Sequence, residues 1–182
     1  MRLIDTFSIK MAQWLVGDYP DEMPSFVQTK YSVKFIITNI IPIVSLIIIA
    51  LITGDYLEYA KAAIPFVILR QFSGGYHIKN ADICVIVSIS LIYLIVNYSY
   101  LLYDHHKVIL LVSIMMCLIY SPSKIASKTI VKKENHFIFK VISVAIIIIC
   151  ILIFDIIIST SIFIQSLLLF HIPLREVKRD ED

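Results

Sequence analysis

The sequence predicts an all-α, polytopic integral membrane protein, with about six transmembrane helices and an N-terminal amphipathic helix at the membrane interface. Hydrophobic residues make up 59% of the 182 residues, and the mean hydropathy is +0.87. These values are too apolar for a soluble globular domain. The apolar residues also form long charge-free runs instead of the 3.6-residue or 2-residue periods of soluble helices and strands.

Residues 1–34 form the predicted interfacial segment. The apolar residues that recur there at helical spacing are Leu3, Ile4, Phe7, Met11, Trp14 and Leu15. Charged residues lie off this stripe, so we expect an amphipathic helix on the membrane, or equally a helix packed on the protein's own cytoplasmic face. Gly17 ends the helix, and Pro20 and Pro24 mark a loop. No cleavable signal peptide is expected, because the first long apolar run starts near Phe35.

Residues 35–174 form the predicted transmembrane catalytic domain. Its expected spans are 35–53, 56–69, 83–103, 108–123, 138–154 and 156–174. The first and third are charge-free runs of about 19 and about 21 residues, long enough to cross the bilayer. The run 56–69 reaches only about 21 Å, so it either extends into the following polar stretch or crosses incompletely. Four full spans, with 56–69 re-entrant and 141–174 a hairpin, remain an alternative.

The distribution of lysine and arginine predicts the orientation. Cations gather in the N-terminal segment, in the polar stretch around residue 75, in the loop after Pro122 and in the tail 175–182. The turns at 54–61, 104–107 and 155 hold few cations. By the positive-inside rule, both termini and the polar stretch are cytoplasmic, in a multi-pass protein of the cell membrane.

The polar stretch 69–84 is where the sequence concentrates chemically active side chains. It holds two of the four glycines, two cations, a carboxylate, an imidazole and a thiol between apolar runs. Such a cluster beside lipid is costly unless it is buried in protein or wetted, so it is a candidate functional site. A histidine and a cysteine together suggest a nucleophile and its base.

His77 and Cys84 can meet only if the chain folds back. In one straight helix they would lie about 10.5 Å apart, too far for proton transfer. Gly74-Gly75 supplies backbone freedom before His77, and Asn80 and Asp82 are good N-cap residues for a helix that would place Cys84 in its first turn. There the helix dipole lowers a thiol pKa and amides can stabilise an oxyanion. Cys117 and Cys150 are expected to be small, unreactive residues of the apolar core. The same structural role is the alternative to a nucleophile for Cys84.

The pattern Arg70, Gly74-Gly75, His77 and Cys84, in a small polytopic chain, resembles the accessory gene regulator B (AgrB) family of Gram-positive quorum sensing. The resemblance covers nearly the whole chain in span layout. It implies a membrane cysteine endopeptidase in which Cys84 attacks and His77 acts as base. The substrate would be an AgrD-type propeptide, which loses its C-terminal tail and is cyclised through an acyl-enzyme thioester. The resemblance also implies a homodimer. No cofactor, no metal and no nucleic-acid partner are expected.

Other residues of the stretch and of the basic loop are expected to bind or position the substrate. Arg70 is suited to pair with a substrate carboxylate. Ser73, Gly74, Gly75 and Asp82 are candidates for positioning, although Asp82 is equally suited to cap a helix. The lysines that are expected to attract an acidic tail are Lys124, Lys128, Lys132 and Lys133; taken alone, they are also a positive-inside signal.

A non-enzymatic membrane transporter or peptide-export protein is the alternative function. Glu58 and Lys61 would be its intramembrane charges, but the sequence has no evident inverted repeat or pair of broken helices. A metalloprotease is disfavoured because the HExxH motif is absent.

Overall fold

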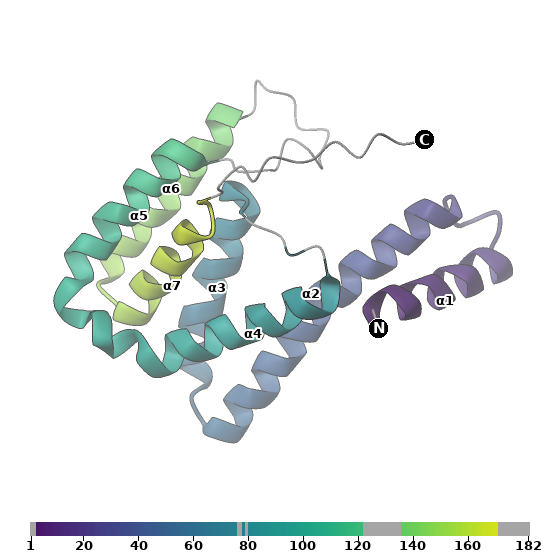
Figure 1. The fold of residues 1–182 in the computed structure, drawn as a ribbon, viewed down its shortest axis with the longest axis horizontal. Helices are drawn as coiled ribbons and strands as arrows, with labels where there is room; N and C mark the ends of the chain where they lie inside the picture. Colours follow the sequence, from purple (N-terminus) through teal and green to yellow (C-terminus); the bar gives the residue numbers. More distant parts are fainter. Residues whose placement is uncertain (1–2, 76–77, 79, 122–135, 171–182) are drawn as a thin grey trace. The chain divides into compact units, whose positions relative to one another are not determined.

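The computed structural model describes residues 3–75, 78, 80–121 and 136–170, which contain helices and no β-strand. The predicted all-α fold class is therefore confirmed. In chain order the elements are α1 (Leu3–Asp18), α2 (Phe26–Thr53), α3 (Tyr56–Ser73), α4 (Ala81–Tyr98), the 3-10 helix η1 (Ser99–His105), α5 (His106–Tyr120), α6 (His136–Ile153) and α7 (Ile156–Leu167) (Figure 1).

The chain folds as two compact units. The first comprises Met1–Lys61 and His77–Tyr98, and therefore holds α1, α2, the beginning of α3 and α4. The second comprises Ala62–Tyr76 and Ser99–Asp182, and holds the rest of α3 with η1, α5, α6 and α7. The polar stretch of the candidate site therefore contributes residues to both units.

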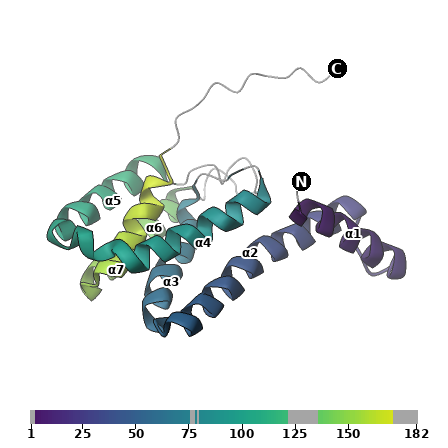
Figure 2. The ribbon, with the colours of Figure 1, turned by 60° about the horizontal axis from the view of Figure 1, so that its bottom comes forward.

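In the first unit, α1 and α2 lie side by side as a helical hairpin (Figures 1 and 2). The buried face of α1 consists of Ile4, Ser8 and Ala12. Leu3, Phe7, Met11 and Trp14 remain exposed. The predicted apolar stripe is thus corrected at one position, because Ile4 packs inward against protein. One face of α1 therefore packs on the chain itself, and an apolar face stays uncovered. The position of this helix on the membrane stays a prediction.

Helix lengths differ from the predicted spans. α2 begins at Phe26, well before residue 35, because hydropathy marks only the apolar part of a helix. Residues 104–107, expected as a turn, are helical, since η1 runs directly into α5.

Among the described residues, Phe26–Thr53 and Ala81–Tyr120 are long and apolar enough to cross a membrane. Most of the isoleucines along α2 are exposed, as expected of a helix that faces lipid.

In the second unit, α5, α6 and α7 surround a common apolar core. Its fully buried members are Leu69, Cys117, Ile147, Ile162 and Leu169. α7 has 12 residues, so it is about 18 Å long and shorter than the predicted span 156–174. Asp155 is the N-cap residue of α7. Its carboxylate accepts hydrogen bonds from the amides of Ile157 at 2.9 Å and Ile158 at 3.3 Å, which stabilises the start of the helix.

Candidate functional site

The diglycine forms a bend that ends α3. The amide of Gly74 donates to the carbonyl of Arg70 at 3.0 Å, which closes the last turn of the helix. Gly74 has φ +77° and Gly75 has φ +137°, conformations that side-chain-bearing residues rarely adopt. Ser73, just before the bend, is fully buried and its hydroxyl donates to the carbonyl of Leu69 at 2.7 Å. The bend therefore requires glycine for conformational reasons.

The bend rests on α7. Gln165 is fully buried, and its Nε2 donates to the carbonyl of Gly74 at 2.9 Å. A Cβ atom on Gly75 would meet Gln165 Nε2 and the carbonyl oxygen of Leu168, each at 3.4 Å. One turn earlier in α7, the hydroxyl of Ser161 donates to the carbonyl of Ala62 at 2.6 Å. The sequence prediction missed Gln165, although a glutamine in an apolar run is itself a signal of buried polar contact.

Arg70 lies in the last turn of α3 and is half-buried. Its guanidinium carbon is 5.9 Å from the centre of the Phe66 ring, within the range of a cation–π contact. The aromatic ring therefore supports the side chain at the end of the helix. Binding of a substrate carboxylate by Arg70 stays a prediction.

Cys84 lies in the first turn of α4. Asn80 caps this helix as the sequence predicted, because its Oδ1 accepts from the amide of Asp82 at 3.0 Å and its carbonyl accepts from the amide of Cys84 at 3.0 Å. The thiol of Cys84 is free and the residue is half-buried. A partly accessible thiol at the N-terminus of a helix is the setting in which a cysteine nucleophile is expected.

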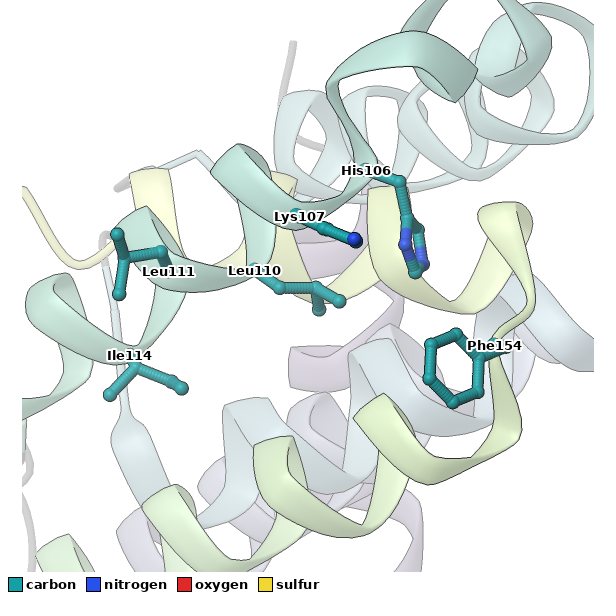
Figure 3. Close-up of a pocket in the computed structure, with 6 residues that line it drawn as sticks. All are labelled: His106, Lys107, Leu110, Leu111, Ile114 and Phe154. Atoms are coloured by element: carbon teal, nitrogen blue, oxygen red, sulfur yellow. The ribbon is translucent and has the colours of Figure 1, made fainter.

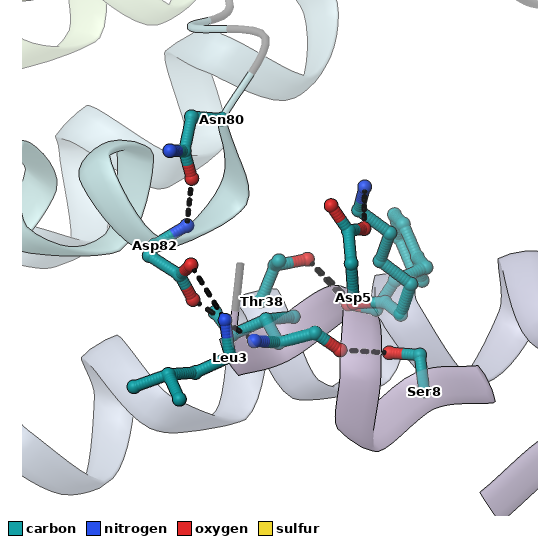
Figure 4. A network of polar contacts seen from close by, with 9 residues as sticks. Leu3, Asp5, Ser8, Thr38, Asn80 and Asp82 are labelled. Atoms are coloured by element: carbon teal, nitrogen blue, oxygen red, sulfur yellow. Dashed lines mark hydrogen bonds and ion pairs between the residues drawn. The ribbon is translucent and has the colours of Figure 1, made fainter. Parts of the chain in front are cut away.

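Asp82 caps a different helix from the one on which it lies. Its two carboxylate oxygens accept hydrogen bonds from the amides of Leu3 at 2.9 Å and Ile4 at 3.0 Å (Figure 4). Ile4 also packs with Ala81 and Val85. The first turn of α1 is therefore fixed against the first turn of α4, two residues from Cys84. This long-range cap could not be inferred from the sequence.

The remaining predicted site residues lie outside the described part of the chain. They are His77, Lys124, Lys128, Lys132 and Lys133. The structure brings Ser73, Gly74 and Gly75 together with Gln165 in the second unit, and Cys84 together with Asn80 and Asp82 in the first.

A separate pocket lies within the second unit, between α5 and the turn that joins α6 to α7. Figure 3 shows His106, Lys107, Leu110 and Phe154 around it; the pocket is completed by Leu111 and Ile114. His106 Nε2 is hydrogen-bonded to Ser159 Oγ at 2.8 Å. None of the six described residues that line the pocket carries a thiol. Within the described residues, no group of three or more His, Cys, Asp or Glu side chains is placed to hold a metal ion.

Comparison with known proteins identifies the family. The family model described as Accessory gene regulator B matches residues 8–173, which is nearly the whole chain. No curated protein and no solved structure matched. The matched region includes the diglycine bend, the first turn of α4 and all of α7. The chain therefore belongs to the accessory gene regulator B family, and this membership supports a role in the processing of a quorum-sensing propeptide.

Proposed function

We propose that this protein is a membrane cysteine endopeptidase that removes the C-terminal tail of an AgrD-type propeptide and promotes its cyclisation. The observation that carries the proposal is the position of Cys84, a free thiol in the first turn of a capped helix, inside a chain of the accessory gene regulator B family. His77 is the proposed base, seven residues before the thiol in the sequence.

The proposed reaction has two transfers. His77 takes the thiol proton, and the sulfur of Cys84 attacks the carbonyl carbon at the cleavage position. The C–N bond breaks, His77 returns the proton to the leaving amine, and a thioester joins the substrate to Cys84. A cysteine thiol of the substrate then attacks this thioester, which forms a thiolactone and releases the Cys84 thiolate for reprotonation; a substrate serine would give a lactone.

Amides at the start of α4 are the proposed oxyanion donors. The amides of Asp82 and Cys84 donate hydrogen bonds to Asn80. Ala81 and Ile83 also lie in the first turn, where a backbone amide has no acceptor within the helix itself. Donors of this kind, together with the helix dipole, stabilise negative charge on the attacked carbonyl oxygen. Exchange between thioesters is nearly isoenergetic, so the cyclic product forms if water is kept away from the intermediate.

The substrate and the assembly belong to the same proposal. Arg70 would pair with a substrate carboxylate, and Lys124, Lys128, Lys132 and Lys133 would attract an acidic tail. Ser73, the diglycine and Asp82 would position the site. The protein would act as a homodimer with about six spans, and with both termini and the site on the cytoplasmic side.

Co-expression with a candidate propeptide tests the proposal. We expect that Cys84→Ala and His77→Ala each abolish cleavage, measured by mass spectrometry of the peptide, at unchanged amounts of protein in the membrane. Cys150→Ala is the matched control, because Cys150 is also a free, half-buried thiol but lies on α6. Cleavage that persists in Cys84→Ala would exclude the cysteine endopeptidase.

A further inference from the structure

We propose that the pocket between α5 and the turn after α6 holds an acyl chain of an anionic phospholipid, with Lys107 beside the phosphate. The site lies wholly within the second unit. None of the six residues that line it belongs to the proposed peptidase, so this proposal does not depend on the proposed function.

The pocket is small and mainly apolar. Its volume is about 210 Å³, and four of its six lining residues have hydrocarbon side chains: Leu110, Leu111, Ile114 and Phe154 (Figure 3). Pockets for drug-sized ligands usually have about 300–1,000 Å³. The available space therefore suits a segment of a flexible chain better than a whole compact ligand.

The pocket is bordered by apolar side chains that are exposed. Leu111 on α5 is 60% exposed, and Phe154 after α6 is 72% exposed. Val108 and Met115 lie about one turn before and one turn after Leu111 on the same face of α5, and they are exposed as well. In a membrane protein, a surface of this kind contacts hydrocarbon. The molecules with direct access to the pocket are therefore lipids.

One side of the pocket is positively charged. Lys107 is exposed, and Figure 3 shows its amine directed toward His106, the other polar residue of the lining. Asp104 and Asp155 are close in the sequence, but neither lines the pocket, and the carboxylate of Asp155 binds amides of α7. The lining therefore favours an anionic group attached to an apolar chain, which is the chemistry of an anionic phospholipid.

Phe154 forms one wall of the pocket in a strained conformation. Its φ is +51°, and it is the only residue other than glycine with a positive φ in the described part of the chain. Glycine or asparagine would fit such a turn with less strain. The Phe154 ring lies against that of His106, with 6.1 Å between ring centres, and His106 Nε2 is hydrogen-bonded to Ser159 Oγ at 2.8 Å. Strain that neighbouring contacts maintain in this way is typical of binding sites.

Photolabelling of the purified protein in mild detergent tests the site. The probe is phosphatidylglycerol with a diazirine in one acyl chain, and mass spectrometry locates the labels after illumination. We expect labels to concentrate on the peptides that contain residues 106–114 and Phe154. Unlabelled phosphatidylglycerol should suppress these labels at about a fivefold lower concentration than phosphatidylcholine, because a single lysine contributes about this factor to the binding of an anionic lipid.

One pair of variants tests recognition of the head group. Lys107→Gln removes the charge at the pocket, so phosphatidylglycerol and phosphatidylcholine should then compete equally. Lys140→Gln is the matched control, because Lys140 lies on α6 in the same unit but does not line the pocket. This variant should keep the wild-type preference for phosphatidylglycerol.

A second pair of variants tests occupation by the acyl chain. Leu111→Trp places a larger side chain at the pocket and should abolish the labels there. Leu118→Trp, at an exposed position two turns farther along α5, should leave them unchanged. Phe154→Gly removes a wall of the pocket and suits the local φ, so it should also weaken the labels, and it serves if Leu111→Trp does not accumulate.

The inference is overturned if the labels spread evenly over the exposed apolar helices, or if Leu111→Trp and Phe154→Gly label as the wild type does. Equal competition by the two lipids in the wild type, or an unchanged preference in Lys107→Gln, would also overturn it, because the pocket would then not recognise the anionic head group.

Discussion

The two ends of the polar stretch 69–84, which belong to different units, are held by opposite kinds of contact. The bend after α3 is fully buried and depends on one donor, Gln165, and on two glycine conformations. The start of α4 is partly exposed and depends on caps, from Asn80 to its own helix and from Asp82 to α1. Loss of a single buried hydrogen bond is costly because water cannot reach the group that is left unpaired. At an exposed helix cap, water can replace part of the lost hydrogen bonding. We therefore expect a rigid bend and a more adaptable turn around Cys84.

Gly75→Ala should give the largest effect on stability. Its φ of +137° is strained for any side chain, and the new Cβ would contact Gln165 and Leu168 at 3.4 Å with no room to relieve that strain by moving closer. The strain should cost about 1–3 kcal/mol and lower the temperature at which the detergent-solubilised protein aggregates. Gly17→Ala is the matched control, since Gly17 lies within α1 and a Cβ there meets nothing within 4 Å. Equal losses in both variants would contradict the importance of the bend.

Asp82→Ala should give an intermediate effect, confined to α1. The substitution removes the acceptor of the amides of Leu3 and Ile4, and loss of such a cap costs about 0.5–2 kcal/mol. Hydrogen exchange should accelerate in the first turn of α1. Asp18→Ala, at the exposed C-terminal end of the same helix, should leave exchange in that turn unchanged. Unchanged exchange in Asp82→Ala would show that the Asp82 cap does not stabilise the first turn of α1.

Lys34→Met should give the smallest effect. Lys34 pairs with Asp5 of α1, but the side chains remain 33% and 19% exposed, so water screens the pair. Such ion pairs contribute between zero and about 1 kcal/mol. Exchange in α1 should therefore change less than in Asp82→Ala. A larger change in Lys34→Met would reverse the proposed order of the two contacts.

Local features of the site could be predicted from the sequence, and distant contacts could not. Asn80 and Gly74 act within a few residues of their own positions, so residue type alone indicated a cap and a bend. Asp82 binds amides 78 and 79 positions away, and Gln165 binds a carbonyl 91 positions away. The sequence could show that both side chains are polar, but their partners depend on how the helices pack.

The same distinction explains the helix bounds. Apolar runs located the helices because burial in lipid requires apolar side chains and internal hydrogen bonding. They did not locate the start of α2 at Phe26, because a helix can continue beyond the hydrocarbon region with polar side chains. Nor did they reveal that η1 keeps the backbone helical between α4 and α5.

The cap that Asp82 places on α1 bears on how the protein is best labelled. A bulky label attached at Leu3 would lie beside the first turn of α4, because the amide of Leu3 donates to the carboxylate of Asp82. Bulk at that point competes with the cap from Asp82, which lies two residues before Cys84. A label at the exposed Trp14, away from the first turn of α1, avoids this interference and is the better choice for assays of the Cys84 thiol.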